Sequence, residues 1–255
     1  MSLLKIEDVS VAFGGLLALD KINVDVNPGT ITALIGPNGA GKTTLLNAIT
    51  GSVRPRTGKI SLSEADITGF PAHSLVRMGL VRTFQLTNVF PNLTVQDNLL
   101  LGSYVFCKPW KELFNDMLSK SDQDLLAAQG IVDEVLDFVG LQSFRNYKAR
   151  QLPYGQQRLL ELGIALGAKP RILLLDEPAA GMNEEETRDL ARLLNRIREN
   201  GVTILLVEHN MRLITSTCDY AYVLVHGRNV TAGPPRQVLQ DPQVIEAYLG
   251  RRKHA

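Results

Sequence analysis

The sequence has few cysteines, no strong excess of charge of one sign and no long run of apolar residues. Cys107 and Cys218 are the only cysteines in 255 residues, and neither belongs to a CxxC pair or a Cys/His cluster. A disulfide framework and a zinc site are therefore not expected, and a reducing compartment fits. The formal net charge is +1, so the strong basic field of a typical nucleic-acid-binding protein is missing. We expect no nucleic-acid partner.

The apolar stretches are also short. Residues 220–225 are among the longest, and they fall far short of the roughly 20 residues that a membrane-spanning helix needs. The first residues mix Lys5, Glu7 and Asp8 with apolar side chains, which differs from the basic and then apolar layout of a signal peptide. We expect any contact with a membrane to be made through a partner protein.

The patterns that are present predict an α/β fold. Of the 255 residues, 45% are hydrophobic, enough to bury a sizeable core. Apolar runs typical of buried strands cover residues 31–35, 172–175 and 202–207, and helical patterns follow them. This alternation predicts a sheet of parallel strands. Asn183 and Glu186 are spaced as a capping box at the start of the helix between the last two strands.

Two regions depart from this alternation. Residues 3–13 and 19–26 have the pattern of short strands separated by glycine turns, which predicts a small antiparallel β lobe. Residues 91–150 show helical spacing without a strong strand candidate. We expect this second region to form an inserted helical subdomain.

A phosphate-binding loop follows the first predicted strand. Residues 36–43 fit the pattern GxxxxGK[ST] and lie between the strand at 31–35 and a helical run. Glycines let successive N–H groups converge on phosphate oxygens, and the positive end of the following helix attracts the same anion. Lys42 is expected to reach the β- and γ-phosphates, and the Thr43 hydroxyl to bind Mg²⁺. The predicted nucleotide-binding residues here are Gly36, Pro37, Asn38, Gly39, Ala40, Gly41, Lys42, Thr43 and Thr44.

Two acidic residues follow the strand at residues 172–175. Asp176 and Glu177 stand where the carboxyl end of a parallel strand opens onto a ligand. Asp176 is predicted to anchor Mg²⁺, directly or through water, and Glu177 to act as the general base that deprotonates the attacking water. The phosphate loop alone leaves kinases, GTPases, helicases and ABC proteins as candidates, so the choice among them depends on the remaining sites.

Three further segments resemble those of ABC ATPases. Gln85, at the end of Arg-Thr-Phe-Gln, is placed like the family's Q-loop glutamine, and His209 like its switch histidine. The sequence Leu-Pro-Tyr-Gly-Gln before a helical run resembles the signature loop. The resemblance implies that Gln85 contacts Mg²⁺, that His209 reaches the γ-phosphate, and that the signature loop binds the ATP of a second subunit. The signature-loop residues are Leu152, Pro153, Tyr154, Gly155 and Gln156.

Two other matches concern the D-loop and the adenine base. Residues 178–183 resemble the family's D-loop, with Gly181, Met182 and Asn183 at its end. Phe13 aligns with the aromatic residue that stacks on adenine, and stacking needs only a π face. A place for Phe13 in the core is the alternative.

The sequence departs from the common family pattern at three positions. Pro153 replaces the serine of Leu-Ser-Gly-Gly-Gln, Tyr154 replaces its first glycine, and Asn183 replaces the usual aspartate of the D-loop. Proline has neither a hydroxyl nor an N–H group, so the serine contact to the opposing γ-phosphate is lost. The N–H of Gly155 and the start of the helix are what remains for that contact.

The resemblance covers essentially the whole chain. It implies a P-loop NTPase (RecA-like) α/β core with an N-terminal antiparallel β lobe and an inserted α-helical subdomain. It also implies ATP and Mg²⁺ as cofactors. We expect residues 1–255 to form a single domain, divided into the β lobe with the phosphate-loop part of the core (1–90), the helical subdomain with the signature loop (91–165), and the remaining core with the C-terminal helices (166–255).

Finer details resemble the ATP-binding subunits of bacterial importers for branched-chain amino acids. The sequences of residues 13–19, 152–158, 178–183 and 245–250 carry this resemblance. It implies a peripheral protein at the cytoplasmic face of the bacterial inner membrane. The implied partners are two permease subunits, a second ATPase subunit that is a paralogue or a second copy of this chain, and, indirectly, a periplasmic binding protein.

Other functions stay open on the sequence alone. No residue of the chain is expected to touch the transported molecule, and ATPases of urea or amide importers and of a lipopolysaccharide exporter share much of the pattern. A non-transport ABC ATPase usually has two fused units or a long coiled coil, which this chain lacks. A non-hydrolysing scaffold is expected to lack the base or the switch histidine, yet Glu177 and His209 are both present.

Overall fold

The computed structural model describes residues 2–83, 89–107 and 122–249. Its strands are β1 (Leu4–Phe13), β2 (Leu16–Val26), β3 (Ile31–Ile35), β4 (Thr57–Leu62), β5 (Ala65–Asp66), β6 (Leu80–Arg82), β7 (Ile172–Asp176), β8 (Thr203–Val207), β9 (Tyr220–Val225) and β10 (Arg228–Gly233). Its helices are α1 (Lys42–Ile49), α2 (Ala72–Arg77), α3 (Val95–Cys107), α5 (Asp122–Val139), α6 (Tyr154–Gly167), α7 (Glu184–Glu199), α8 (Met211–Thr217), α9 (Pro235–Val238) and α10 (Pro242–Leu249), with 3₁₀ turns at Gln142–Phe144 and Ala149–Gln151.

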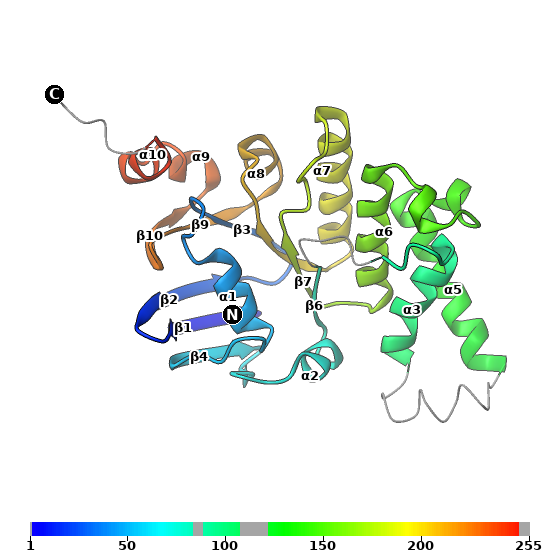
Figure 1. Cartoon of the computed structure of the whole chain (residues 1–255), viewed down its shortest axis with the longest axis horizontal. Coiled ribbons are helices and arrows are strands. Elements are labelled where there is room, and N and C mark those ends of the chain that lie inside the picture. Colours follow the sequence, from blue (N-terminus) through cyan, green and yellow to red (C-terminus); the bar gives the residue numbers. More distant parts are fainter. Residues whose placement is uncertain (1, 84–88, 108–121, 250–255) are drawn as a thin grey trace.

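The central sheet has the strand order β10-β9-β3-β8-β7-β6 (Figure 1). Strands β9, β3, β8, β7 and β6 are parallel, and β10 pairs antiparallel with β9. Along β7, Leu173 and Leu175 pack in one core with helices α6 and α7. Ile172 and Leu174 point to the other face and pack in a core with α1. Because both faces are covered, the strand is a continuous apolar run, and the predicted parallel α/β fold is confirmed.

The N-terminal lobe is an antiparallel sheet of order β2-β1-β4-β5. The hairpin pairs Leu4 with Val26 at one end and Phe13 with Leu16 at the other. The predicted antiparallel lobe is therefore confirmed, although its second strand begins at Leu16 and not at residue 19. Leu16 and Leu17 are exposed, so this end of the strand lacks the buried alternation that marks the rest.

Helices α3, α5 and α6 pack together at the end of the sheet opposite β10 (Figure 1). The helical spacing expected in residues 91–150 is seen in α5, whose apolar residues Val132, Val135 and Leu136 are buried in this bundle. Helices α3 and α6 approach closely, since a Cβ atom on Gly102 would lie 2.3 Å from the Ile164 carbonyl oxygen. The bundle thus fixes the orientation of α6, whose first turn, from Tyr154, is part of the signature loop.

Helix α7 begins with the predicted capping box. The Asn183 Oδ1 atom accepts hydrogen bonds from the N–H groups of Glu185 and Glu186 at 2.9 and 3.0 Å. The Asn183 N–H donates to Glu186 Oε2 at 2.9 Å. This reciprocal pairing satisfies donors at the helix start and fixes the chain between β7 and α7.

Candidate nucleotide-binding site

A cavity of about 980 Å³ lies over the loop that joins β3 to α1. Among the predicted site residues, Pro37, Asn38, Gly39, Ala40, Gly41, Lys42, Thr43, Thr44, Glu177 and His209 line it. The ends of β7 and β8 bring the last two to the loop, as expected where parallel strands finish at one edge of a sheet. Leu16, Leu17, Ala18, His226, Gly227 and Tyr248 complete the lining.

The phosphate loop can follow its path only with glycine at certain positions. Gly36 has φ +154°, and a Cβ atom there would lie 2.1 Å from the Leu224 carbonyl oxygen of β9. Gly41 has φ +102°, and a Cβ atom there would lie 2.6 Å from Leu19 Cδ2. The loop is therefore pressed against β9 at its start and against β2 at its end, and any side chain at either glycine would displace the backbone.

Lys42 is the first residue of α1 and is buried. Its ammonium donates hydrogen bonds to the carbonyl oxygens of Gly36 at 2.8 Å and Pro37 at 3.1 Å. Burial lowers the pKa of Lys42, while the nearby carboxylates of Glu177 and Asp176 favour its charged form. The Lys42 ammonium is thus held against the first two residues of the phosphate loop, next to the N-terminus of α1, which attracts anions.

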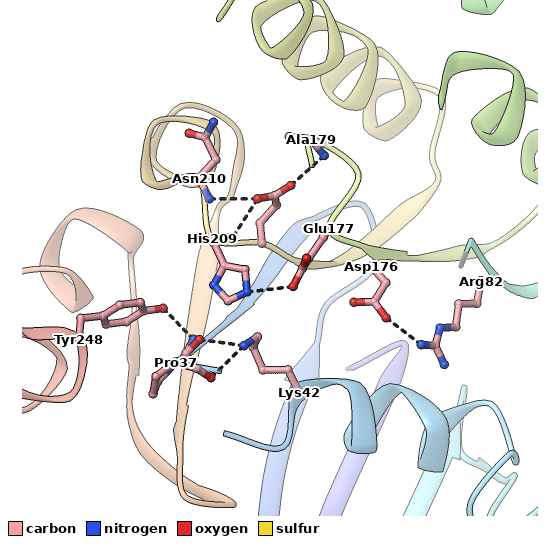
Figure 2. A network of polar contacts seen from close by, with 11 residues as sticks. Pro37, Lys42, Arg82, Asp176, Glu177, Ala179, His209, Asn210 and Tyr248 are labelled. Carbon is pink, nitrogen blue, oxygen red and sulfur yellow. Dashed lines mark hydrogen bonds and ion pairs between the residues drawn. The ribbon is translucent and has the colours of Figure 1, made fainter. Parts of the chain in front are cut away.

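The two predicted acids differ in their surroundings. Asp176 is only 2% exposed and pairs through Oδ2 with the guanidinium of Arg82 at 2.8 Å. Its Oδ1 atom is buried and has no hydrogen-bond partner in the part of the chain that the structure describes. Glu177 lines the cavity, and its Oε1 atom is 2.9 Å from His209 Nε2 (Figure 2). One acid is therefore buried and fixed, and the other faces the space where a substrate would lie.

Glu208 is a site residue that the sequence interpretation missed. It is 3% exposed, and its carboxylate accepts hydrogen bonds from the N–H groups of Ala179, His209 and Asn210 at 2.9, 2.8 and 3.0 Å (Figure 2). It therefore joins the segment after β7 to the segment after β8. The signal that identified Asp176, an acid at the end of a buried strand, was also present at Glu208.

Arg82 was also missed. Its NH1 group donates to Asn47 Oδ1 of α1 at 2.7 Å, while its NH2 group pairs with Asp176. Both side chains of the Arg82–Asp176 pair are almost fully buried. The Arg82 guanidinium thus joins β6, to which it belongs, to α1 through Asn47 and to β7 through Asp176.

The signature loop and the D-loop contact each other rather than the cavity. A Cβ atom on Gly181 would lie 2.9 Å from Tyr154 Cε1, and one on Gly155 would lie 2.5 Å from Glu186 Oε1. Arg158 donates to the Tyr154 hydroxyl at 3.1 Å. No residue of either loop is among the described residues that line the cavity. The two loops form a second surface of the chain.

Two further predicted residues have different outcomes. Phe13, at the end of β1, is 51% exposed and is not among the described residues lining the cavity, whereas Leu16 and Leu17 across the hairpin are. Its stacking on adenine stays a prediction. Gln85 lies outside the described residues.

In the described ranges, no helix is both long enough and apolar enough to cross a bilayer.

Comparisons with known proteins agree with this geometry. The family model described as "ABC transporter" matches residues 19–180, and one described as "Branched-chain amino acid ATP-binding cassette transporter" matches residues 230–254. The chain is 39% identical to the high-affinity branched-chain amino acid transport ATP-binding protein BraF of Pseudomonas aeruginosa, over 97% of this chain and 98% of that one. It is 40% identical to LivG of Escherichia coli K12, which has the same descriptive name, with the same coverage.

Solved structures give the same result for the fold. A nucleotide-free ATP-binding cassette from an ABC transporter superposes with a TM-score of 0.85 at 31% identity, covering 98% of this chain and 100% of that one. A cassette in its ADP conformation superposes with a TM-score of 0.85 at 33% identity and the same coverage. The predicted P-loop NTPase fold is confirmed, and the chain belongs to the ABC transporter family, as an ATP-binding cassette.

Proposed function

We propose that this chain hydrolyses ATP and thereby energises an importer of branched-chain amino acids at the cytoplasmic face of a bacterial inner membrane. The observation that carries the hydrolysis is the contact between Glu177 and His209 in the cavity that also holds the phosphate loop. The names of BraF and LivG, which are similar to this chain along nearly its whole length, support the transported class.

Lys42 has the central part in binding the phosphates. In the structure its ammonium is hydrogen bonded to two carbonyl oxygens of its own loop. A phosphate oxygen is a stronger partner because the hydrogen bond is then between two charged groups. Lys42 therefore turns from the loop carbonyls to the β- and γ-phosphates when ATP binds, while the N–H groups of the loop and of the α1 start bind the remaining oxygens.

The donor set beside the loop fits Mg²⁺. The buried Asp176 Oδ1 atom without a described partner and the Thr43 hydroxyl are hard oxygen donors of the type that Mg²⁺ prefers. Gln85 is the third candidate ligand from the sequence. When bound, Mg²⁺ neutralises charge on the terminal phosphates. Arg82 holds the Asp176 carboxylate in place by pairing with its other oxygen.

Glu177 and His209 activate the water. The Glu177 carboxylate accepts a proton from water as the water oxygen bonds to the γ-phosphorus and the bond to the ADP oxygen breaks. With its Nε2 protonated, His209 donates to Glu177 Oε1 and holds that carboxylate in position. Glu208 in turn holds the backbone of His209 and of the segment that begins at Ala179.

The surface formed by the signature loop and the D-loop binds the nucleotide of a second subunit in this proposal. Gly155 and the start of α6 supply N–H groups on the surface formed by the signature loop and the D-loop. We propose that this surface binds the ATP of a paralogue or a second copy of this chain, so that ATP favours the closed dimer. ATP can change the free-energy difference between the open and closed dimer by no more than the difference between its binding free energies to the two states. Two permeases receive the movement, and a periplasmic binding protein delivers the amino acid.

The test is ATP hydrolysis in vesicles that contain this chain with candidate permeases, a partner ATPase and a leucine-binding protein. We expect leucine-loaded binding protein to stimulate hydrolysis, and the Glu177→Gln variant to abolish it. Hydrolysis that is indifferent to amino acids would discard the importer assignment while keeping the ATPase. Stimulation by urea, an amide or a lipopolysaccharide instead would assign the chain to one of the related systems.

A further inference from the structure

The C-terminal helix α10 contacts β10 and shares an apolar core with β3, the strand that leads into the phosphate loop. Val244 of α10 is 2% exposed and lies in one apolar core with Ala33 and Ile35 of β3. Tyr248, one turn later, packs against the same core. Figure 1 shows α10 next to β9 and β10, at the end of the sheet opposite the helical bundle. Helix α10 is therefore anchored to β3, directly before the phosphate loop, although more than 200 residues separate the two in sequence.

Tyr248 reaches the loop itself. The backbone N–H of Gly36 donates a hydrogen bond of 2.9 Å to the Tyr248 hydroxyl (Figure 2). Tyr248 also lines the cavity over the phosphate loop. Burial raises the pKa of Tyr248, so the hydroxyl stays neutral at physiological pH. The first residue of the phosphate loop thus receives its hydrogen-bond acceptor from α10, the last helix that the structure describes.

The contact matters because Gly36 is held from several sides. Its carbonyl oxygen accepts from Lys42, and its Cα faces the Leu224 carbonyl with no room for a side chain. In the proposed function Lys42 exchanges the Gly36 carbonyl for a phosphate, whereas the bond from the Gly36 N–H to Tyr248 involves no group that binds phosphate. Tyr248 is therefore placed to hold the start of the loop after Lys42 has turned to the nucleotide.

We infer that Tyr248 is a positioning residue of the nucleotide site, and that α10 and the phosphate loop are energetically coupled through its hydroxyl. The inference rests on the proposed nucleotide binding by this loop. A pre-positioned backbone loses less conformational freedom when it binds phosphate, so removal of the hydroxyl weakens binding. Coupling is reciprocal, so nucleotide also stabilises the docking of α10.

The experiment compares Tyr248→Phe with Tyr222→Phe in the full chain. Tyr222 is a matched control because its hydroxyl accepts from the backbone N–H of Asp25 at 3.0 Å, away from the cavity. Magnesium–ADP is titrated into each variant by calorimetry, and Tm is measured alongside. Loss of one hydrogen bond predicts a dissociation constant about fivefold higher for Tyr248→Phe and unchanged for Tyr222→Phe. Amide exchange in α10 is expected to slow with ADP in the unmodified chain and to slow less in Tyr248→Phe.

Lys42→Ala separates this inference from the function on which it rests. If Lys42→Ala weakens ADP binding strongly and Tyr248→Phe behaves like Tyr222→Phe, the positioning role is wrong and the nucleotide site stands. If Lys42→Ala binds ADP as tightly as the unmodified chain, the proposed site is wrong, and the inference falls with it. A higher dissociation constant for Tyr248→Phe alone among the two tyrosine variants supports the inference.

Discussion

The phosphate loop and the signature loop place backbone N–H groups at the start of a helix in two different settings. The phosphate loop lies under a cavity whose other walls, including Glu177 and His209, come from the same chain. The signature loop contacts the D-loop through Tyr154 and Gly181 and is not among the described residues of that cavity. One chain therefore carries the phosphate loop, Glu177 and His209 around one cavity and a second set of N–H groups on a separate surface, which in the proposed function acts on the nucleotide of another subunit.

The two loops are also supported differently. Gly36 and Gly41 are needed because backbone and side chains of β9 and β2 leave no space for a Cβ atom. In the signature loop, Tyr154 replaces a glycine and becomes a support, since Arg158 donates to its hydroxyl and lies over its ring at 5.3 Å. The aromatic residue at this position therefore joins the start of α6 to Arg158 in the next turn and to Gly181 of the D-loop.

Glu177→Gln is expected to have the largest effect, and it changes only the phosphate-loop cavity and not the signature-loop surface. Glutamine cannot accept the proton of the attacking water, so turnover is expected to fall by about a thousandfold, whereas ATP affinity is expected to stay unchanged. The variant is also expected to accumulate as an ATP-bound dimer in the presence of its partner subunit. Phosphate release and size-exclusion chromatography measure the two effects, and faster turnover would contradict the assignment of the base.

Gly155→Asp tests the signature loop in the same assays. The added side chain would meet Glu186 Oε1, which lies 2.5 Å from the position that a Cβ atom would take, and its carboxylate would repel the phosphates of the opposite ATP. Turnover of the assembled transporter is expected to fall about a hundredfold, because the displaced and negatively charged loop no longer stabilises the phosphates. Gly130→Asp, at an exposed position of α5 where no atom lies within 4 Å of a Cβ, is the control and is expected to be active. Full activity of Gly155→Asp would remove this loop from the mechanism.

Glu208→Gln perturbs the link between His209 in the phosphate-loop cavity and the segment at Ala179, which belongs to the D-loop. Its carboxylate accepts three backbone N–H groups, and an amide nitrogen placed against one of them leaves that donor unpaired. We expect turnover to fall about tenfold as His209 shifts, with ADP affinity unchanged. Glu184→Gln, at an exposed ion pair with Arg212, is the control. Equal turnover in the two variants would show that Glu208 has no part in catalysis.

Pro153→Ser is expected to have the smallest effect. Pro153 is the N-cap residue of α6 and has no side-chain acceptor, whereas serine can bond to a free N–H group of the first turn. Stability is expected to rise by about 0.5–1 kcal/mol and turnover to stay within about twofold. Thermal unfolding and ATP hydrolysis measure the two effects. Abolished hydrolysis would mean that Pro153 itself is required.

Local patterns were enough to predict strands β1, β2, β3, β7 and β8, the phosphate loop and the capping box of α7, but not the short strands β4, β5 and β6 or the edge strand β10. Each depends on residues close together in sequence: an apolar run, a glycine-rich loop, or Asn183 and Glu186 three positions apart. The contact of Tyr248 with Gly36 spans 212 positions, and nothing in the local sequence of either residue indicates it. The same holds for Arg82 and Asp176, because pairing across a parallel sheet depends on strand order, which a single sequence does not state.

The central claim is that this chain binds its own nucleotide through the phosphate loop and acts on another subunit's nucleotide through the signature loop. The most direct test is the ADP affinity of the isolated chain in Lys42→Ala and Gly155→Asp, measured side by side. We predict a loss of about a hundredfold or more for Lys42→Ala, which removes charge-assisted hydrogen bonds to phosphate, and no change for Gly155→Asp. Equal losses in both variants would mean that the signature loop contacts the nucleotide of its own chain, and would contradict the account.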